Sequence, residues 1–408
     1  MNILFLSHYF PPEVNAPATR TFEHCKVWAE QGHDVTVLTC APHHPMGKLY
    51  PGFKNRFFQK EQRDGITVVR VLTYITANEG FLKRTANYVF FMIMAILVSP
   101  FLKKTDVVIS TSPQFFNGLA GYFVSRLKRS PWVLEIRDLW PESILAVGAV
   151  KNRQVIAVLE WIERFVYRKA DRIVSVTDSF CSHIVRAGAE PEKLVVVRNG
   201  VDLDAFSLGF SSDGRESLEL GLEGKFVAAY VGTHGMAHGL DTILDAAELL
   251  RDNDEIVFLM VGDGAERARL IEEKERRSLQ NVQMLGQQPK ECMPMIWQQT
   301  DVSLVLLKRL DLFKSVIPSK IFESMAMGKP IILGVEGEVA AIVAESAAGV
   351  CIEPESAQEL AESVLALATD RQRYDSMSNA GRPYVSEHFD RKVLAKKLLS
   401  VVEATTKS

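Results

Sequence analysis

Short apolar segments rich in β-branched residues alternate with amphipathic helical segments along the chain, and the alternation restarts after residues 198–206. Such a repeat is typical of βαβ units, because two parallel strands need a long crossover connection. The predicted strands are 2–7, 34–39, 66–72, 106–111, 132–136, 172–177 and 193–197, then 226–232, 256–262, 281–285, 302–307 and 330–334. The pattern predicts an α/β protein with two doubly wound, Rossmann-like parallel-sheet domains.

A chain of 408 residues suits two domains of about 200 residues each. We predict a first domain at 1–200, joined by a C-terminal crossover helix at about 388–408, and a second domain at 201–387. Ligands of such sheets bind beyond the carboxyl ends of the strands. The cleft between the two domains is therefore the expected site.

Composition narrows the function classes. A hydrophobic fraction of 47% and a charged fraction of 24% are typical of a folded globular protein, and a net charge of −3 does not indicate a nucleic-acid partner. The N-terminus lacks the basic region and cleavage site of a signal peptide. The cysteines lack CxxC spacing and suit a reducing cytoplasm, without disulfides or a zinc site: Cys25, Cys40, Cys181, Cys292 and Cys351.

An apolar run at 88–102 is flanked by basic residues, Lys83 and Arg84 before it and Lys103 and Lys104 after it. It is shorter than the roughly 20 residues of a spanning helix. It is either a buried core helix or a helix that lies partly in a membrane interface.

The segment 47–63 mixes aromatic and basic side chains in a loop that contains Pro and Gly, which favours the interface. Its candidate contacts with a membrane or acceptor are Phe53, Lys54, Arg56, Phe57 and Phe58, together with Lys83 and Arg84.

The segment 317–334 places a cation and a carboxylate in an otherwise apolar helix. Pro318 and Ser319 suit a helix start, with Ser319 as the cap. Free amides there, together with Lys320, predict an anion site, and Glu323 lies one turn further on, where it can accept hydrogen bonds from ligand hydroxyls. The alternative is a surface ion pair between Lys320 and Glu323.

Two glycine-containing loops follow strands of the second domain, and glycine lets backbone approach a phosphate closely. They contribute Gly232, Thr233, His234 and Gly235, then Gly262 and Gly264. We expect no metal at His234 and His238, because glycines interrupt the helical spacing.

In the first domain, the loop 7–20 enters a helix, and "EIRDLWPES" (135–143) places Arg137 and Asp138 at a strand end. No nucleophile-and-base motif, metal motif or carboxylate cluster is found. The expected chemistry is one that positioning and electrostatics can supply, such as departure of a phosphate leaving group, without a cofactor or metal.

The order of these segments resembles the retaining glycosyltransferases of family 4, which have the GT-B fold. The resemblance rests on "PPEVNAPATRTFEHCKVWAEQGHDVTVLT", "EIRDLWPES", "RNGVDLDAF", "VGTHGMAHGLDTI", "VGDGAERARL", "IPSKIFESMAMGKPIIL" and "AAGVCIEPES". The chain is most similar to transferases of bacterial O-antigen, capsule and exopolysaccharide assembly, notably the N-acetyl-L-fucosaminyl transferase branch.

The resemblance implies roles for single residues. Glu323 matches the second glutamate of the E-x7-E motif, which holds the nucleotide ribose. Gly232 opens the phosphate loop, and the 262–264 turn lines the nucleotide side. Arg137 and Asp138 stand where many relatives have a His–Asp pair beside the reacting carbon. Asn15 and Ala16 replace a Gly-rich loop near the diphosphate and acceptor, leaving less room there.

Two further departures from the family pattern matter. Ser315 replaces the first glutamate of the motif, which makes a deoxy or amino sugar plausible. Thr233 and His238 replace a usual Arg and Lys, so that Lys320 becomes the expected partner of the diphosphate.

The resemblance implies metal-independent, retaining transfer from a UDP-sugar to a polyprenyl-diphosphate-linked saccharide. Such an enzyme would work in the cytoplasm, peripherally on the inner face of the cytoplasmic membrane. The alternatives are a nucleotide-sugar 2-epimerase of the same fold and a non-catalytic protein that binds nucleotide-sugars.

Overall fold

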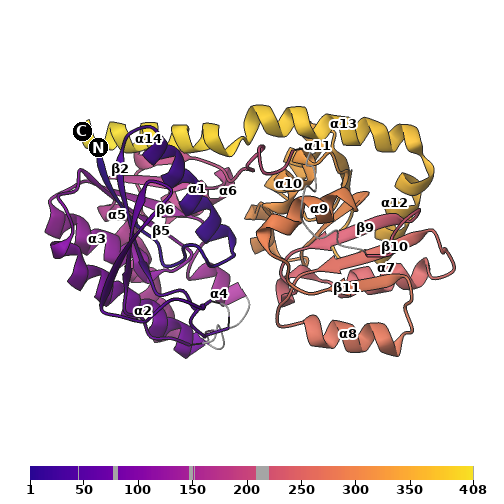
Figure 1. Cartoon of the computed structure of the whole chain (residues 1–408), viewed down its shortest axis with the longest axis horizontal. Coiled ribbons are helices and arrows are strands. Elements are labelled where there is room, and N and C mark those ends of the chain that lie inside the picture. The colour runs from indigo at the N-terminus through magenta and orange to yellow at the C-terminus, as the bar shows by residue number, and fades with distance from the viewer. Residues whose placement is uncertain (45, 77–80, 147–149, 151, 208–219, 408) are drawn as a thin grey trace. The chain divides into compact units, whose positions relative to one another are not determined.

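The computed structural model describes all residues except 45, 77–80, 147–149, 151, 208–219 and 408. The chain divides into two compact units (Figure 1). Unit 1 comprises Met1–Asn199 and Arg391–Ser408, and unit 2 comprises Gly200–Asp390. Most of the polar stretch expected between the domains, 207–224, lies outside the described residues.

Unit 1 is built on an 8-stranded sheet with the strand order β3-β4-β2-β1-β5-β6-β7-β8. Its strands are β1 (Asn2–Leu6), β2 (Asp34–Cys40), β3 (Phe58–Arg63), β4 (Ile66–Val71), β5 (Val107–Thr111), β6 (Trp132–Ile136), β7 (Arg172–Ser175) and β8 (Leu194–Val196). Its helices are α1 (Ala16–Glu30), α2 (Phe81–Val98), η1 (Ser99–Phe101), α3 (Phe116–Lys128), α4 (Glu142–Ala146), α5 (Arg153–Lys169), α6 (Asp178–Arg186), η2 (Pro191–Lys193) and α14 (Arg391–Lys407).

Strand β3 corrects the expectation of a loop throughout 47–63. It pairs antiparallel with β4 at the edge of the sheet, whereas every other pairing in this sheet is parallel. Its residues are mostly polar and alternate between exposed and half-buried, so apolar periodicity does not reveal them. The signal was Asp64-Gly65, both at positive φ (48° and 78°), since this dipeptide is a strong hairpin signature.

Both faces of the unit 1 sheet are covered. Helices α2, α3 and α5 pack on one face, and α1 and α14 pack on the other. The C-terminal helix α14 buries Leu394, Leu398 and Val402, and the Trp28 indole of α1 donates a hydrogen bond to the Ala395 carbonyl (2.8 Å). These contacts explain why the end of the chain belongs to unit 1.

Helix α2 is partly buried and partly exposed. Leu82–Phe101 is long and apolar enough to cross a membrane by length and composition, with a mean hydropathy of 1.4, and 39% of this window is buried. This window starts before the predicted apolar run at 88–102, and it therefore includes the basic residues Lys83 and Arg84. Phe91 and Ala95 lie in the core, whereas Ile93 and Leu97 are 46% and 52% exposed.

Unit 2 is built on a 6-stranded sheet with the order β11-β10-β9-β12-β13-β14. Its strands, all parallel, are β9 (Phe226–Val231), β10 (Ile256–Val261), β11 (Val282–Leu285), β12 (Val302–Leu306), β13 (Ile331–Gly334) and β14 (Gly349–Cys351). Its helices are η3 (Met236–His238), α7 (Asp241–Leu249), α8 (Arg267–Arg276), η4 (Lys290–Cys292), α9 (Met293–Gln298), η5 (Asp311–Ser315), α10 (Lys320–Ala326), α11 (Glu338–Ser346), α12 (Ala357–Thr369) and α13 (Arg371–His388). The strand order reverses between β9 and β12, where doubly wound sheets bind ligands.

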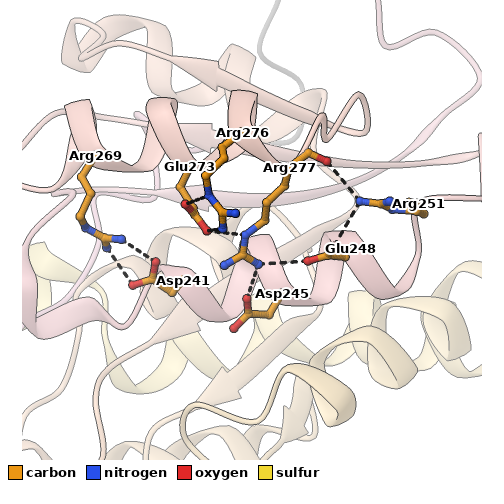
Figure 2. A network of polar contacts seen from close by, with 8 residues as sticks. All are labelled: Asp241, Asp245, Glu248, Arg251, Arg269, Glu273, Arg276 and Arg277. Carbon is orange, nitrogen blue, oxygen red and sulfur yellow. Dashed lines mark hydrogen bonds and ion pairs between the residues drawn. The ribbon is translucent and has the colours of Figure 1, made fainter.

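An ion-pair network joins helices α7 and α8 on the surface of unit 2 (Figure 2). Arg269 contacts both carboxylate oxygens of Asp241 at 2.8 Å, and Arg277 reaches Asp245 and Glu248 from one guanidinium nitrogen. These helices begin directly after the glycine loops that follow β9 and β10. The network therefore fastens together the elements that support the two loops.

Candidate functional site

The loops after β9 and β10 are joined backbone to backbone. The amides of Gly232 and His234 donate to the carbonyls of Val261 and Asp263, both at 2.9 Å. Gly262 and Gly264 have φ values of 146° and 158°, and a Cβ at either position would collide with the backbone of Gly232 or His234. Glycine is required here because the two loops approach more closely than any side chain allows.

Lys320 of α10 reaches this pair of loops. A Cβ on Gly232 would lie 2.9 Å from Lys320 Nζ, so a side chain there would displace the ammonium. Nζ is buried, forms no hydrogen bond with the described residues and lies 3.6 Å from the centroid of the Tyr230 ring. Burial lowers the pKa of Lys320 to about 7, partly opposed by Glu323. A buried amine that forms no hydrogen bond with the described residues is a candidate partner for an anionic ligand.

Glu323 lies one turn along α10 and is half-buried. Burial raises the pKa of its carboxyl, against the opposing influence of Trp297, Lys290 and Lys320. The alternative of a surface ion pair with Lys320 is wrong, because Lys320 Nζ has no hydrogen-bond partner among the described residues.

Ser319 occupies the N-cap position of α10, but its side chain makes no capping hydrogen bond, contrary to the expectation. Its backbone already has helical angles (φ −60°, ψ −21°), whereas a capping side chain needs an extended backbone.

His234 is completely buried, and neither of its ring nitrogens has a hydrogen-bond partner among the described residues. Burial, Arg267 and Lys320 lower its pKa to about 4, so that the ring is neutral at neutral pH. Burial and Lys320 lower the pKa of His238 to about 4 as well. Among the described residues, no group of three or more His, Cys, Asp or Glu side chains is arranged to hold a metal ion.

Arg137 lies in unit 1, at the end of β6, within a buried charge cluster. Its amide donates to Ser112 Oγ (2.6 Å), while its Nε and Nη1 are buried and have no hydrogen-bond partner within the described part of the chain. The nearby Glu135 carboxylate accepts hydrogen bonds from Arg20 Nε (2.9 Å) and Thr111 (2.6 Å). Despite its burial, the arginines hold the pKa of Glu135 at about 2, and burial lowers the pKa of Arg137 to about 10.

Arg20 was not singled out from the sequence. Its remaining nitrogens donate to the carbonyls of Val197 and Arg198 and to the Asn199 side chain, the last residues of the first segment of unit 1. Its partner Glu135 lies within an otherwise apolar strand segment. No sequence pattern near Arg20 or Glu135 therefore predicts their ion pair.

Asp138 follows Arg137 and accepts a hydrogen bond from Ser143 Oγ (3.3 Å), and burial raises its pKa. Arg84 lies near this carboxyl, with its guanidinium 5.7 Å from the centroid of the Trp140 ring. Arg84 therefore packs in unit 1 beside Asp138, a predicted catalytic residue. The sequence pattern instead predicts Arg84 to be among the basic residues that flank the apolar run and contact the membrane or acceptor.

Asn15 and Ala16 lie at the start of α1. Asn15 is the N-cap, and its Oδ1 accepts a hydrogen bond from the Ala18 amide (2.9 Å), while its Nδ2 is buried and no described residue bonds to it. Ala16 is the first residue of the helix. The side chain of Asn15 thus caps the helix through a hydrogen bond that glycine, which has no side chain, cannot form.

Glu13, in the same loop, is a buried carboxylate that sequence reasoning missed. It accepts hydrogen bonds from the amides of His43 and His44 (both 3.0 Å) and Phe10 (3.4 Å). Burial raises its pKa to about 7, although these donors oppose the shift. Through these hydrogen bonds Glu13 connects the loop after β1 to the loop after β2. No sequence pattern near Glu13 predicts this contact.

The residues predicted to contact a membrane or acceptor divide into two groups. The exposed ones are Lys54, Arg56, Phe57, Phe58 and Lys83. Phe53, in contrast, packs under the guanidinium of Arg70, 4.9 Å from its ring centroid.

Two family models match the chain, one in each unit. Residues 15–200 match the glycosyl transferase 4-like domain, and residues 215–383 match the glycosyl transferases group 1. A protein of Escherichia coli (strain K12) named as the colanic acid biosynthesis glycosyl transferase WcaI is 26% identical over 88% of this chain and 90% of its own length.

The chain is similar to many solved structures, including two that each cover 99% of it at 16% identity. Sucrose-phosphate synthase from Thermosynechococcus elongatus matches over 98% of its own chain with a TM-score of 0.77. Anabaena HepE in complex with UDP-glucose matches over 100% of its own chain with a TM-score of 0.72. The fold prediction is confirmed, and with both units matched the chain belongs to the group 1, family 4-like glycosyltransferases of the GT-B fold.

Proposed function

We propose that this glycosyltransferase moves a sugar from a UDP-sugar to a polyprenyl-diphosphate-linked saccharide during assembly of a bacterial surface polysaccharide, with retention of the anomeric configuration. The similarity to a protein named for colanic acid biosynthesis supports the polysaccharide, and the complex of Anabaena HepE with UDP-glucose supports the nucleotide. Ser315 in place of the first motif glutamate favours a deoxy or amino sugar such as N-acetyl-L-fucosamine as the donor sugar.

The observation that carries the proposal is the buried ammonium of Lys320 beside two interlocked glycine loops. Burying a cation without a counter-ion costs free energy, which an anionic ligand would recover. A diphosphate supplies two negative phosphates of suitable size for a glycine-lined site, and Glu323, one turn further along α10, would accept the hydrogen bonds of the ribose hydroxyls.

The reaction follows from these roles. The bond between the sugar C1 and the diphosphate oxygen breaks, and its electron pair stays on the leaving phosphate. Lys320 and the 232–235 loop stabilise the growing negative charge, so that no metal is needed. The acceptor hydroxyl oxygen then bonds to C1 from the leaving-group face, and its proton passes to a phosphate oxygen. We assign acceptor binding, together with Arg137 and Asp138, to unit 1.

A nucleotide panel tests the donor site. We expect UDP to raise the melting temperature of the protein more than GDP, ADP or dTDP do, because a ligand of the native state stabilises it. Replacing Glu323 by Gln should weaken UDP binding about 10- to 100-fold, the range for a lost hydrogen bond to a charged group. Binding of inorganic pyrophosphate, which has no ribose, should stay within about twofold.

The matched control is Glu272→Gln, an exposed carboxylate on α8, which should bind UDP like the wild type. If none of the nucleotides stabilises the wild-type protein, the assignment of the donor site is wrong. If Glu323→Gln weakens UDP and pyrophosphate equally, Glu323 does not bind the ribose.

The acceptor part of the proposal places unit 1 at an anionic membrane surface. Apolar side chains are exposed on the helix layer of this unit, with Ile93 and Leu97 on α2, Phe101 (78%) in η1, and Phe123 and Leu127 on α3. Lys83 and Lys104 are exposed near the two ends of α2, and α2 contains no acidic residue. Exposed apolar area flanked by basic charge suits a bilayer that contains anionic lipids.

Co-sedimentation with phosphatidylcholine vesicles, with and without phosphatidylglycerol, tests this surface. We expect the wild type to pellet with the anionic vesicles, and a Phe57→Ser, Phe58→Ser variant and an Ile93→Ser, Leu97→Ser variant to pellet less. Phe53 stays unchanged because it packs under Arg70. Val393→Ser, at a 54% exposed position on α14, is the control. Equal pelleting of all four proteins would contradict the membrane proposal.

A further inference from the structure

One buried aromatic side chain contacts both parts of the candidate donor site. Tyr230 lies near the end of β9 with no exposed surface. The face of its ring lies against Lys320 Nζ, 3.6 Å from the ring centroid, and its hydroxyl donates a hydrogen bond to the Thr233 carbonyl (2.8 Å). The same residue thus contacts the cation of α10 and the glycine loop.

We propose that Tyr230 is a positioning residue that holds the Lys320 ammonium beside the Gly232 loop for the donor diphosphate. The inference rests on the proposed function, since it needs a nucleoside diphosphate as the ligand. Lys320 Nζ has no hydrogen-bond partner among the described residues, so the negative face of the ring is the contact that fixes the position of its charge. Because Gly232 lacks a side chain, the ammonium can occupy this place.

The charges around Lys320 predict a proton linkage. Glu323 faces it from its own helix, and the titratable groups of the neighbouring loops and helices are His234, His238, Asp263, Arg267 and Lys290. Burial lowers the pKa of Lys320 to about 7, and a diphosphate bound beside it would raise the pKa again. Above pH 7, the unliganded lysine is largely neutral, and binding of a diphosphate takes up a proton.

At pH 8, proton uptake by Lys320 can be distinguished from proton uptake by the neighbouring histidines. His234 and His238 have pKa values of about 4, so both rings stay neutral at that pH. Proton uptake on binding therefore reports on the lysine. Above pH 7, where the terminal phosphate of UDP is already ionised, the affinity for UDP should fall as the pH rises, because the proton that Lys320 requires becomes scarcer.

A double-mutant cycle, measured by calorimetric titration with UDP, tests the role of Tyr230. We expect Tyr230→Leu to weaken UDP binding about 5- to 30-fold, the range of a desolvated cation–π contact. In a Lys320→Met background the same substitution should change the affinity less than about twofold, since the cation that it positions is absent. Equal factors in the two backgrounds would mean a purely structural role and would overturn the inference.

The proton count gives a second, independent readout. Titrations at pH 8 in buffers of different ionisation enthalpy should show proton uptake for the wild type and none for Lys320→Met. Tyr230→Phe keeps the ring and loses the bond to Thr233, so it should keep the uptake even if Tyr230→Leu fails to fold. Loss of uptake in Tyr230→Phe would overturn the inference.

The same titrations separate the inference from the function on which it rests. If the wild type binds neither UDP nor inorganic pyrophosphate, the proposed function is refuted. If it binds them while the cycle is additive, only the role of Tyr230 is refuted.

Discussion

Replacing Lys320 by Met should lower kcat/KM for sugar transfer about 10²- to 10³-fold, the loss that follows removal of one group that stabilises developing charge. The buried ammonium has no hydrogen-bond partner among the described residues, so the substitution breaks no hydrogen bond of this group and should leave the fold intact. The methylene chain is largely preserved in methionine. The measurement is initial-rate kinetics with a labelled donor, together with the melting temperature of the unliganded protein.

Lys329 provides a matched control, because it follows the other end of α10 and is also half-buried, with a pKa lowered by burial. Lys329→Met should keep wild-type kinetics. An active Lys320→Met enzyme would show that the leaving phosphate is neutralised by another group. A melting temperature that falls by tens of degrees would instead assign Lys320 a structural role.

Replacing Glu135 by Gln should destabilise unit 1 by about 3–5 kcal/mol at neutral pH. The side chains of Glu135 and Arg20 are 1% and 4% exposed and lie 2.9 Å apart, and the charge of Arg137 also acts on this carboxylate. The amide of glutamine cannot offset these buried cations. Differential scanning calorimetry of the wild type and the variant measures the effect.

The pH dependence of this difference has a defined sign. The pKa of Glu135 is about 2 in the folded protein, below its ordinary value of 4.5. The stability that this depressed pKa contributes is present above pH 4.5 and is lost as the pH falls towards 2, about 3 kcal/mol in all. The wild type loses this contribution and the Gln variant does not, so the gap between them should narrow as the pH falls.

Glu160→Gln is the control in the same unit, because Glu160 pairs with Arg164 at 3.7 Å with both side chains 43% exposed. An exposed pair of this kind contributes about 0–1 kcal/mol. A gap between the wild type and Glu135→Gln that is small, or that does not change with pH, would contradict the account of the buried cluster.

The fold was predictable from the sequence because its strands are buried on both faces. Runs such as 226–231 and 256–261 are almost continuously apolar and end at glycine, which indicates parallel strands under helices. The expected strand boundaries agree with the structure within one or two residues there. Strand β3 was missed because it is a half-exposed edge strand, and β14 because a strand of three residues has no period to detect.

Parts of the candidate site were also predictable. Gly232, Gly262, Lys320 and Glu323 could be singled out because glycine before a helix and a charge inside an apolar segment are both conspicuous in a sequence. Their mutual contacts could not be inferred, since the two loops and α10 are brought together by the strand order of the sheet. Glu13, Arg20 and Tyr230 gave no signal, because each has an ordinary sequence context and acquires its role from partners on other elements.

The sequence by itself therefore determined the two doubly wound sheets and the residue types available at the strand ends, since burial of apolar strands and the conformational demands of glycine act locally. The tertiary structure decided which charges are paired. It gave Glu135 a buried arginine partner and placed Lys320 Nζ against the ring of Tyr230, with no hydrogen-bond partner among the described residues. The physical reason is that the free energy of a buried charge depends on neighbours supplied by other segments of the chain, which only the completed fold brings within reach.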